Sequence, residues 1–343
     1  MNRGHPVNRA ERIARRLDCW QQRYRPTAFV FAVVKKFGDD QGGNLVALLA
    51  YYAFLCTFPL LLALTTILGL VLRNSPRLQR DLVNSAFAEF PIIGTQIHGQ
   101  LAVAMFGNTF SLTVGLLGAF LGGSGFANAL QNTLSSLWAV PRRDRPGFPA
   151  NYLRTVVLLL LLAVGVAVTA AASAAAGTAT ARGLGGFAAH LISITVGSVL
   201  GFGYFLAACR VAAPAQVPTR SMVPGAAVSA LAWQLLLTGG GLIVAHLLRN
   251  AQAVAGLFGV VLGLLAWFGL QATVVVYAIE ADVVRAKHLW PRSLIPPPLT
   301  DADMAYYTDA VRAHAQRPEQ RLQIDYLPEA TTAGRDNIAA LDH

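Results

Sequence analysis

Acidic residues are absent from a long central part of this sequence. Between Arg145 and Glu280 no Asp or Glu occurs over 134 residues, and only five arginines interrupt that stretch with a full charge. In the whole chain 13% of residues are charged and 55% are hydrophobic, whereas soluble domains keep about a quarter of their residues charged. A water-soluble fold is therefore excluded for this central part, and lipid is its expected solvent.

Cysteine and clustered histidine are also scarce, which excludes several kinds of site. The three cysteines offer no disulfide framework, and no two of the seven histidines stand at the spacing of metal ligands. No phosphate-binding G-x-x-x-x-G-K-[ST] loop occurs either. We therefore expect no metal, no cofactor and no enzymatic activity, and a ribonuclease in particular would lack its acid/base or metal chemistry.

Six apolar stretches are long enough to cross a bilayer, which takes about 20 residues per helix. They predict an all-α fold, a polytopic membrane bundle of about six transmembrane helices. The six expected spans are residues 45–72, 110–130, 155–177, 187–209, 224–248 and 253–279. They define a transmembrane domain over residues 45–284, with an arm before it (1–44) and a tail after it (285–343).

The distribution of basic residues indicates the orientation, because cytoplasmic loops near spans are enriched in Lys and Arg. If both ends of the chain are cytoplasmic, 22 of the 27 Lys and Arg lie inside and 5 lie outside. We expect a bacterial inner-membrane protein with both ends inside. The net charge of +10 then indicates contact with anionic lipid headgroups and does not require a nucleic acid partner.

The two ends differ in character. Residues 8–25 place Ile13, Leu17, Trp20 and Tyr24 at helical spacing with arginines around them, which predicts a basic amphipathic helix at the headgroup level. The tail is expected to be partly disordered, but Asp301–Gln316 has acids early and Arg312 late, as the helix dipole prefers. A short helix is predicted there.

Four local patterns together resemble a known family. They are LVALLAYYAFLCTFPLLLAL, LQNTLSSLWAVPRRDRPGF, VPTRSMVPGAAVSALAWQ and LFGVVLGLLAWFGLQATVVVYAIEADVV, with an acidic pair before the first. In this order they resemble the YihY/virulence factor BrkB family over about residues 25–290. The residues that carry the resemblance are Asp39, Asp40, Tyr51, Tyr52, Pro59, Asn132, Trp138, Arg145, Pro146, Pro224, Gly225, Trp233, Trp267 and Glu280. The resemblance implies a six-helix membrane protein with both ends inside; similar proteins have been labelled ribonucleases, virulence factors and transporters.

Polar residues within membrane spans are costly and are often functional. The candidates for a transport path or gate are Pro59, Asn132, Gln234, Gln271 and Glu280. For Glu280 two interpretations stand: an ion pair with Arg145 or Arg154, which we favour, or a gating carboxylate. Arg142, Arg143, Arg145 and Arg154 are candidates for headgroup contact or ion pairing.

Two further features concern helix structure. Pro59 and Gly239–Gly241 could each bend or break a helix, and a broken helix can mark a substrate site. Asp39 and Asp40 are interpreted as caps for the amino end of the first span, since no catalytic partner is visible beside them.

Two functions of different class follow from these features. One is a transporter or exporter of a lipid or amphipathic solute, with a cavity around Pro59, the junction of the second and third spans, and the sixth span. The alternative is a non-transporting membrane scaffold or envelope-integrity protein that docks partners through its arm and tail. Membrane lipids are the expected partners in both cases, and a second copy of the chain is a further candidate.

The orientation can be tested by labelling cysteines from outside intact cells. A cysteine introduced at Gln79 should react, because residues 75–100 are expected outside, and one introduced at Ser293 should be spared. The opposite labelling pattern would contradict the six-span orientation.

Overall fold

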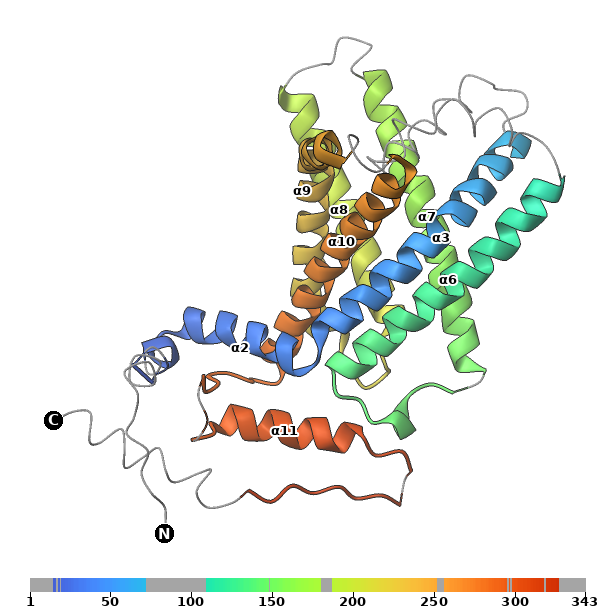
Figure 1. The fold of residues 1–343 in the computed structure, drawn as a ribbon. Helices are drawn as coiled ribbons and strands as arrows, with labels where there is room; N and C mark the ends of the chain where they lie inside the picture. Colours follow the sequence, from blue (N-terminus) through green and yellow to red (C-terminus); the bar gives the residue numbers. More distant parts are fainter. Residues whose placement is uncertain are drawn as a thin grey trace. The chain divides into compact units, whose positions relative to one another are not determined.

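Helices make up the regular structure of the described part of the chain, as expected. The computed structural model describes residues 15–71 (except 17 and 19), 109–179 (except 148), 187–251 and 256–326 (except 295, 297 and 318), and no strand occurs among them. The helices are α2 (Arg25–Asp39), α3 (Gly42–Val71), α6 (Thr109–Leu137), η1 (Arg142–Asp144), α7 (Ala150–Ala179), α8 (Phe187–Ala212), α9 (Thr219–Ala251), α10 (Gly256–Ala286) and α11 (Asp301–Ala313) (Figure 1).

The chain divides into two compact units. Unit 1 comprises residues 1–42, 135–145 and 279–343, so it gathers both ends of the chain. Unit 2 comprises residues 43–134 and 146–278, which include most of the six long helices.

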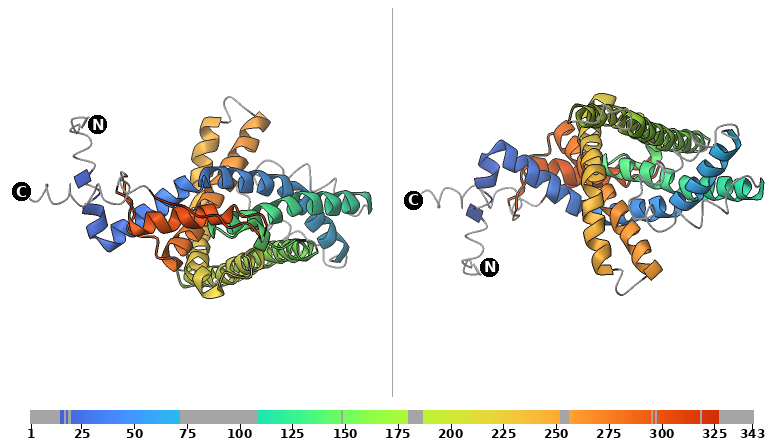
Figure 2. Two further views of the ribbon diagram at one scale, coloured as in Figure 1. Left: turned by 90° about the horizontal axis from the view of Figure 1, so that it is seen from below. Right: turned by 90° about the horizontal axis from the view of Figure 1, so that it is seen from above.

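Glycines let the helices of unit 2 pack closely. A methyl group at Gly118 would lie 2.8 Å from Cβ of Pro59, and one at Gly122 would lie 3.0 Å from Cα of Cys56. Glycine at these two positions therefore brings α6 against the backbone of α3, and both views in Figure 2 draw these helices side by side. Gly201 likewise faces Ala230, where α8 packs on α9.

No helix is broken at Pro59 or at Gly239–Gly241. Both α3 and α9 continue through these residues as single helices. Proline removes only one backbone donor, and a membrane helix can keep the bonds on either side of it. The close contact with Gly118 gives Pro59 a packing role.

The described residues support membrane crossing for some of the six expected spans. Three helical segments are long and apolar enough to cross a membrane, Gly42–Leu60, Ile194–Ala212 and Val261–Ala286, and Ala150–Gly165 is a shorter apolar one. The six expected apolar stretches correspond to α3, α6, α7, α8, α9 and α10. The number of spans and the domain limits built on it stay predictions.

Unit 1 contains α2, η1, α11 and the carboxyl ends of α6 and α10. Helices α6 and α10 end in the same way. The amide of Val140 donates to the carbonyl of Ser135 and that of Leu289 to Val284, while Ala139 (φ 51°) and His288 (φ 54°) adopt left-handed backbone. Both helices therefore end in Schellman-type turns, although neither residue is a glycine.

The amino-terminal prediction is only partly testable. The predicted amphipathic helix over residues 8–25 lies largely outside the described residues, as does position 79. Residues 20–23 are helical, and α2 then begins at Arg25, within the segment that was expected to be part of a polar arm. The short tail helix is confirmed as α11, capped by Thr300.

The glycine packing of α6 on α3 can be tested with a matched pair of alanine variants. Gly122→Ala should lower the thermal stability of the purified protein in detergent, because overpacking against backbone costs about 1–3 kcal/mol. Gly203→Ala, also within a helix, should change little because nothing lies within 4 Å of the added methyl group. Equal melting temperatures for the two variants would contradict this account.

Candidate functional site

A buried ammonium group, that of Lys36, lies on the covered side of α2 in unit 1. Its Nζ atom lies 2.7 Å from Oε2 of Glu280, 2.5 Å from Oδ2 of Asp40 and 2.9 Å from the carbonyl oxygen of Leu137. Lys36 is 2% exposed and Glu280 is 0% exposed. A lysine has three N–H donors, so each donor has one acceptor and the buried charge is fully satisfied.

Asp40 extends this arrangement to the tail. Its Oδ1 atom accepts a hydrogen bond of 2.5 Å from the hydroxyl of Tyr306 in α11. Burial, together with the charge of Asp40, raises the pKa of Tyr306 well above its usual range. The phenol therefore stays protonated and acts as a donor.

A second buried charge, Arg292, lies beside the first and is 0% exposed. Its Nε donates to Oδ1 of Asp303 at 2.8 Å, its Nη2 lies 2.9 Å from Oδ2 of Asp39, and its guanidinium carbon lies 4.3 Å from the centre of the Tyr306 ring. We name the set Lys35, Lys36, Asp39, Asp40, Glu280, Arg292, Asp303 and Tyr306 the charge cluster.

Asp303 is the acceptor that several segments share. Its carboxylate accepts from Nζ of Lys35 (2.9 Å), from Nε of Arg292 and from the backbone amide of Ser293 (2.8 Å), and it completes the capping box with Thr300. Burial would raise its pKa, but the hydrogen bonds from Ser293, Lys35 and Arg292 outweigh burial and hold the pKa below its ordinary value. Asp303 is therefore ionised at neutral pH.

Lysines also complete the carboxyl end of α6. Lys36 bonds the carbonyl oxygen of Leu137, and Lys287 donates to that of Trp138 at 2.9 Å. The last carbonyls of a helix lack helical donors and carry partial negative charge, so both ammonium groups are favourable there.

The residues before α2 hold the start of the tail. Asp18 accepts from the backbone amide of Leu294 at 2.9 Å, and the side-chain amide of Gln21 donates to the carbonyl of Arg292 at 2.8 Å. Ser293 between them is 1% exposed. A cysteine there would be shielded on either side of the membrane, so the labelling test of orientation should use exposed Glu319 instead.

Two interpretations from the sequence need correction. Glu280 pairs with Lys36 and not with Arg145 or Arg154, because α2 folds back onto the end of α10. Nε of Arg145 donates to the carbonyl of Val140, and Nη1 of Arg154 donates to the carbonyl of Ala213. Asp39 and Asp40 lie at the carboxyl end of α2, and their oxygens pair with Arg292, Lys36 and Tyr306. We therefore no longer interpret them as caps of the first span.

The residues expected to form a transport path lie on several helices. Pro59 faces Gly118, Asn132 is exposed on α6, Gln234 lies beside Gly197, and Gln271 is buried in α10. These four belong to unit 2, whereas Glu280 belongs to unit 1. Among the remaining motif residues, Trp138, Gly225 and Trp267 are buried, Tyr51, Arg142 and Arg143 are exposed, and Tyr52, Pro146, Pro224 and Trp233 are half-buried.

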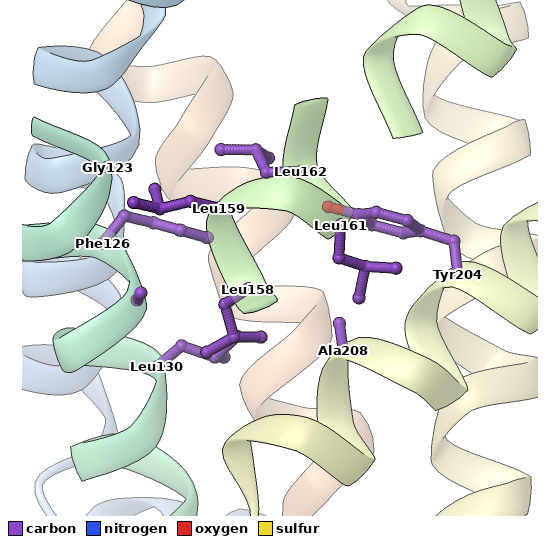
Figure 3. A pocket seen from close by; sticks show the side chains of 10 residues that line it. Gly123, Phe126, Leu130, Leu158, Leu159, Leu161, Leu162, Tyr204 and Ala208 are labelled. Carbon is purple, nitrogen blue, oxygen red and sulfur yellow. The ribbon is translucent and has the colours of Figure 1, made fainter. Parts of the chain in front are cut away.

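Unit 2 contains a pocket between α6, α7 and α8, away from Pro59. It is small, with room for about one water-sized sphere (about 20 Å³), and its lining is almost entirely apolar. Residues of the lining include Phe126 and Leu130 of α6, Leu158 and Leu162 of α7, and Tyr204 and Ala208 of α8 (Figure 3). The Tyr204 hydroxyl points toward α7 and is the one polar side-chain group of this lining.

Polar groups gather one helical turn beyond this pocket. Gln131 of α6 donates to Thr155 of α7 at 3.2 Å, and Arg154 holds the carbonyl of Ala213 at 3.2 Å. Arg154 precedes the pocket residue Leu158 by four positions, about 6 Å along a helix. A half-buried arginine therefore lies about one helical turn from the pocket, outside its lining.

Fold and composition together define an all-α integral membrane protein. The model of the virulence factor BrkB family matches residues 33–297, and the chain belongs to that family, as the resemblance implied. No curated protein and no solved structure matches the chain. The matched region includes Lys36, Glu280 and Arg292 but ends before Asp303 and Tyr306 in α11.

No catalytic arrangement stands out in the described part of the chain. No group of three or more His, Cys, Asp or Glu side chains there could hold a metal ion. The carboxylates of the charge cluster are paired with Lys or Arg, so they are poorly placed to act as free bases.

Sequence reasoning missed Lys35, Lys36, Arg292, Asp303 and Tyr306 as site residues. The amino-acid composition could have pointed to the lysines, because the sequence has only three, Lys35, Lys36 and Lys287. All three form ion pairs within unit 1, with Asp303, with Asp40 and Glu280, and with Asp309. Three rotatable donors suit these sites better than the planar fork of arginine.

The Lys36–Glu280 pair should carry much of the stability of unit 1. Glu280→Gln and Lys36→Met should each destabilise the purified protein by about 3–5 kcal/mol, because each leaves a buried charge without its partner. Lys36→Arg should also destabilise it, since a guanidinium cannot reproduce the three-acceptor geometry. Thermal or denaturant unfolding in detergent gives the measurement.

The matched control for this test is the more exposed pair Lys287–Asp309. Asp309→Asn should cost no more than about 1 kcal/mol, as is usual for partly solvated pairs. If Asp309→Asn were as damaging as Glu280→Gln, burial of the Lys36–Glu280 pair would not be the reason for its importance.

Proposed function

We propose that this chain is a transporter or exporter of a lipid or another amphipathic solute. The observation that supports the proposal best is the pocket of unit 2. Its aliphatic and aromatic lining would suit a hydrocarbon chain if α6, α7 and α8 moved apart to admit one, and Arg154, one helical turn away, would suit an anionic headgroup. A solute that is polar throughout would gain little from such a lining.

Several further features are consistent with this role. The apolar helices and the family membership make membrane lipid the immediate surroundings of the chain. Exposed Arg142 and Arg143 in η1 can attract anionic headgroups on the side that we expect to be cytoplasmic. We propose the bacterial inner membrane, with both ends inside, as the location.

The transport proposal can be tested with purified protein in liposomes that carry a fluorescent anionic lipid. The unmodified protein should speed movement of the lipid between leaflets. Ala208→Phe should fill the pocket and slow movement about tenfold or more, which corresponds to about 1.4 kcal/mol of lost binding. Arg154→Gln should slow anionic lipid more than zwitterionic lipid.

The matched control is Val199→Phe, an equally large aromatic on α8 at a position that is 64% exposed. It should leave lipid movement unchanged. Both variants should first be shown to fold, by gel filtration and thermal melting. If the unmodified protein moved no lipid under any gradient, the transport proposal should be abandoned.

The second candidate is a non-transporting scaffold or envelope-integrity protein. The charge cluster supports the scaffold role because its ion pairs fix α11 in place. Asp301, Ala305 and Arg312 of α11 are exposed and could contact a partner. Deleting the tail would not test this role cleanly, because it would remove the partners of Lys35 and Asp39. Substitutions of the three exposed residues are the better test of partner capture.

A further inference from the structure

Helix α2 has its polarity reversed relative to a helix in water. Its covered side contains Ala28, Ala32, Val33 and the ammonium of Lys36, whereas Val30 and Val34 on the opposite side are 61% and 50% exposed. In an ordinary amphipathic helix the valines would be covered and the lysine exposed. The charged groups of α2 are instead satisfied inside unit 1, and its outward side is apolar.

The whole outward side follows this pattern. At 100° per residue, Thr27, Val30, Phe31, Val34 and Phe37 share one side of the helix, and no charged residue lies among them. Covering a valine side chain is favourable in proportion to the apolar area removed from water. Leaving this side of α2 in water is therefore unfavourable.

The length of α2 restricts what can cover this side. Fifteen residues of helix extend about 22 Å, which is less than the roughly 30 Å hydrocarbon core of a bilayer. The helix is thus too short to span, and the charges on its covered side also forbid it. It can, however, lie in the plane of a membrane surface with one side in the lipid.

The first residue of α2 and the residues just before it add charge of the matching sign. Arg16, Arg23 and Arg25 are exposed, and so are the aromatic rings of Trp20 and Tyr24. Arginines are attracted to anionic headgroups, and Trp and Tyr favour the membrane interface. Among the described residues from 15 to 39, Asp39 is the one exposed acidic residue, and its carboxylate is paired with Arg292.

We propose that the outward side of α2, together with Trp20 and Tyr24, is a docking surface for an anionic bilayer. The helix lies at the level of the headgroups, with Val30 and Val34 in the acyl region. Its charged side is held to α11 by Lys35–Asp303 and to the segment before α11 by Asp39–Arg292. This proposal does not depend on the transport proposal.

The test uses the full chain in bilayers, with spin labels at single cysteines. Labels replace Val30, Val34 and, as the control, exposed Glu319, in a Cys19→Ser background where Cys56 and Cys209 are buried. Collision with oxygen, which enters lipid, is compared with collision with a water-soluble nickel complex. We expect a positive depth parameter at residues 30 and 34 and a negative one at residue 319.

Lipid composition provides the second arm of the test. The depth parameter at residues 30 and 34 should rise from zwitterionic to phosphatidylglycerol-containing bilayers, and Arg23→Gln with Arg25→Gln should abolish that rise. Collision with the nickel complex at residues 30 and 34 would overturn the proposal. A depth parameter that does not change when anionic lipid is added would also overturn it. Exclusion of both probes with label-to-label broadening would overturn it in favour of a second copy of the chain.

Discussion

The structure of unit 1 depends on one buried ammonium group. Lys36 bonds acceptors from three segments: Asp40 after α2, the Leu137 carbonyl at the end of α6, and Glu280 near the end of α10. A buried charge is costly unless all its donors are satisfied, so these segments must meet at one place. The constraint is geometric as well as electrostatic, because three N–H bonds fix three directions.

The other charges form a second layer of the same arrangement. Arg292 and Asp303 connect the tail to Asp39 and Lys35, and Tyr306 joins both layers through its hydrogen bond to Asp40 and its ring beneath Arg292. The region matched by the BrkB family contains the Lys36–Glu280 pair but stops before α11. The outer layer therefore uses residues beyond the family region to bind the tail.

In unit 2 the organising interactions are steric. Gly118 and Gly122 bring α6 against Pro59 and Cys56, and polar side chains such as Gln131 and Thr155 bond each other where lipid offers no partner. Helices packed in this way leave an apolar pocket that only Tyr204 makes partly polar. The chemistry of that pocket, and not a cluster of ionisable groups, is the basis of the proposed handling of amphipathic solutes.

The sequence by itself determined the all-α class, the membrane character and the family, because each depends on composition, apolar run length or local motif order. It also located the tail helix, since its capping residues are neighbours in the chain. Only the tertiary structure decided the partner of Glu280, which is 244 residues from Lys36, and the position of the pocket. Ion pairing depends on distance in space, which the sequence does not give. Arg145 and Arg154 carry the same charge as Lys36, so the sequence could not select the partner of Glu280. Similarly, the reversed polarity of α2 became visible only when the fold showed which side is covered.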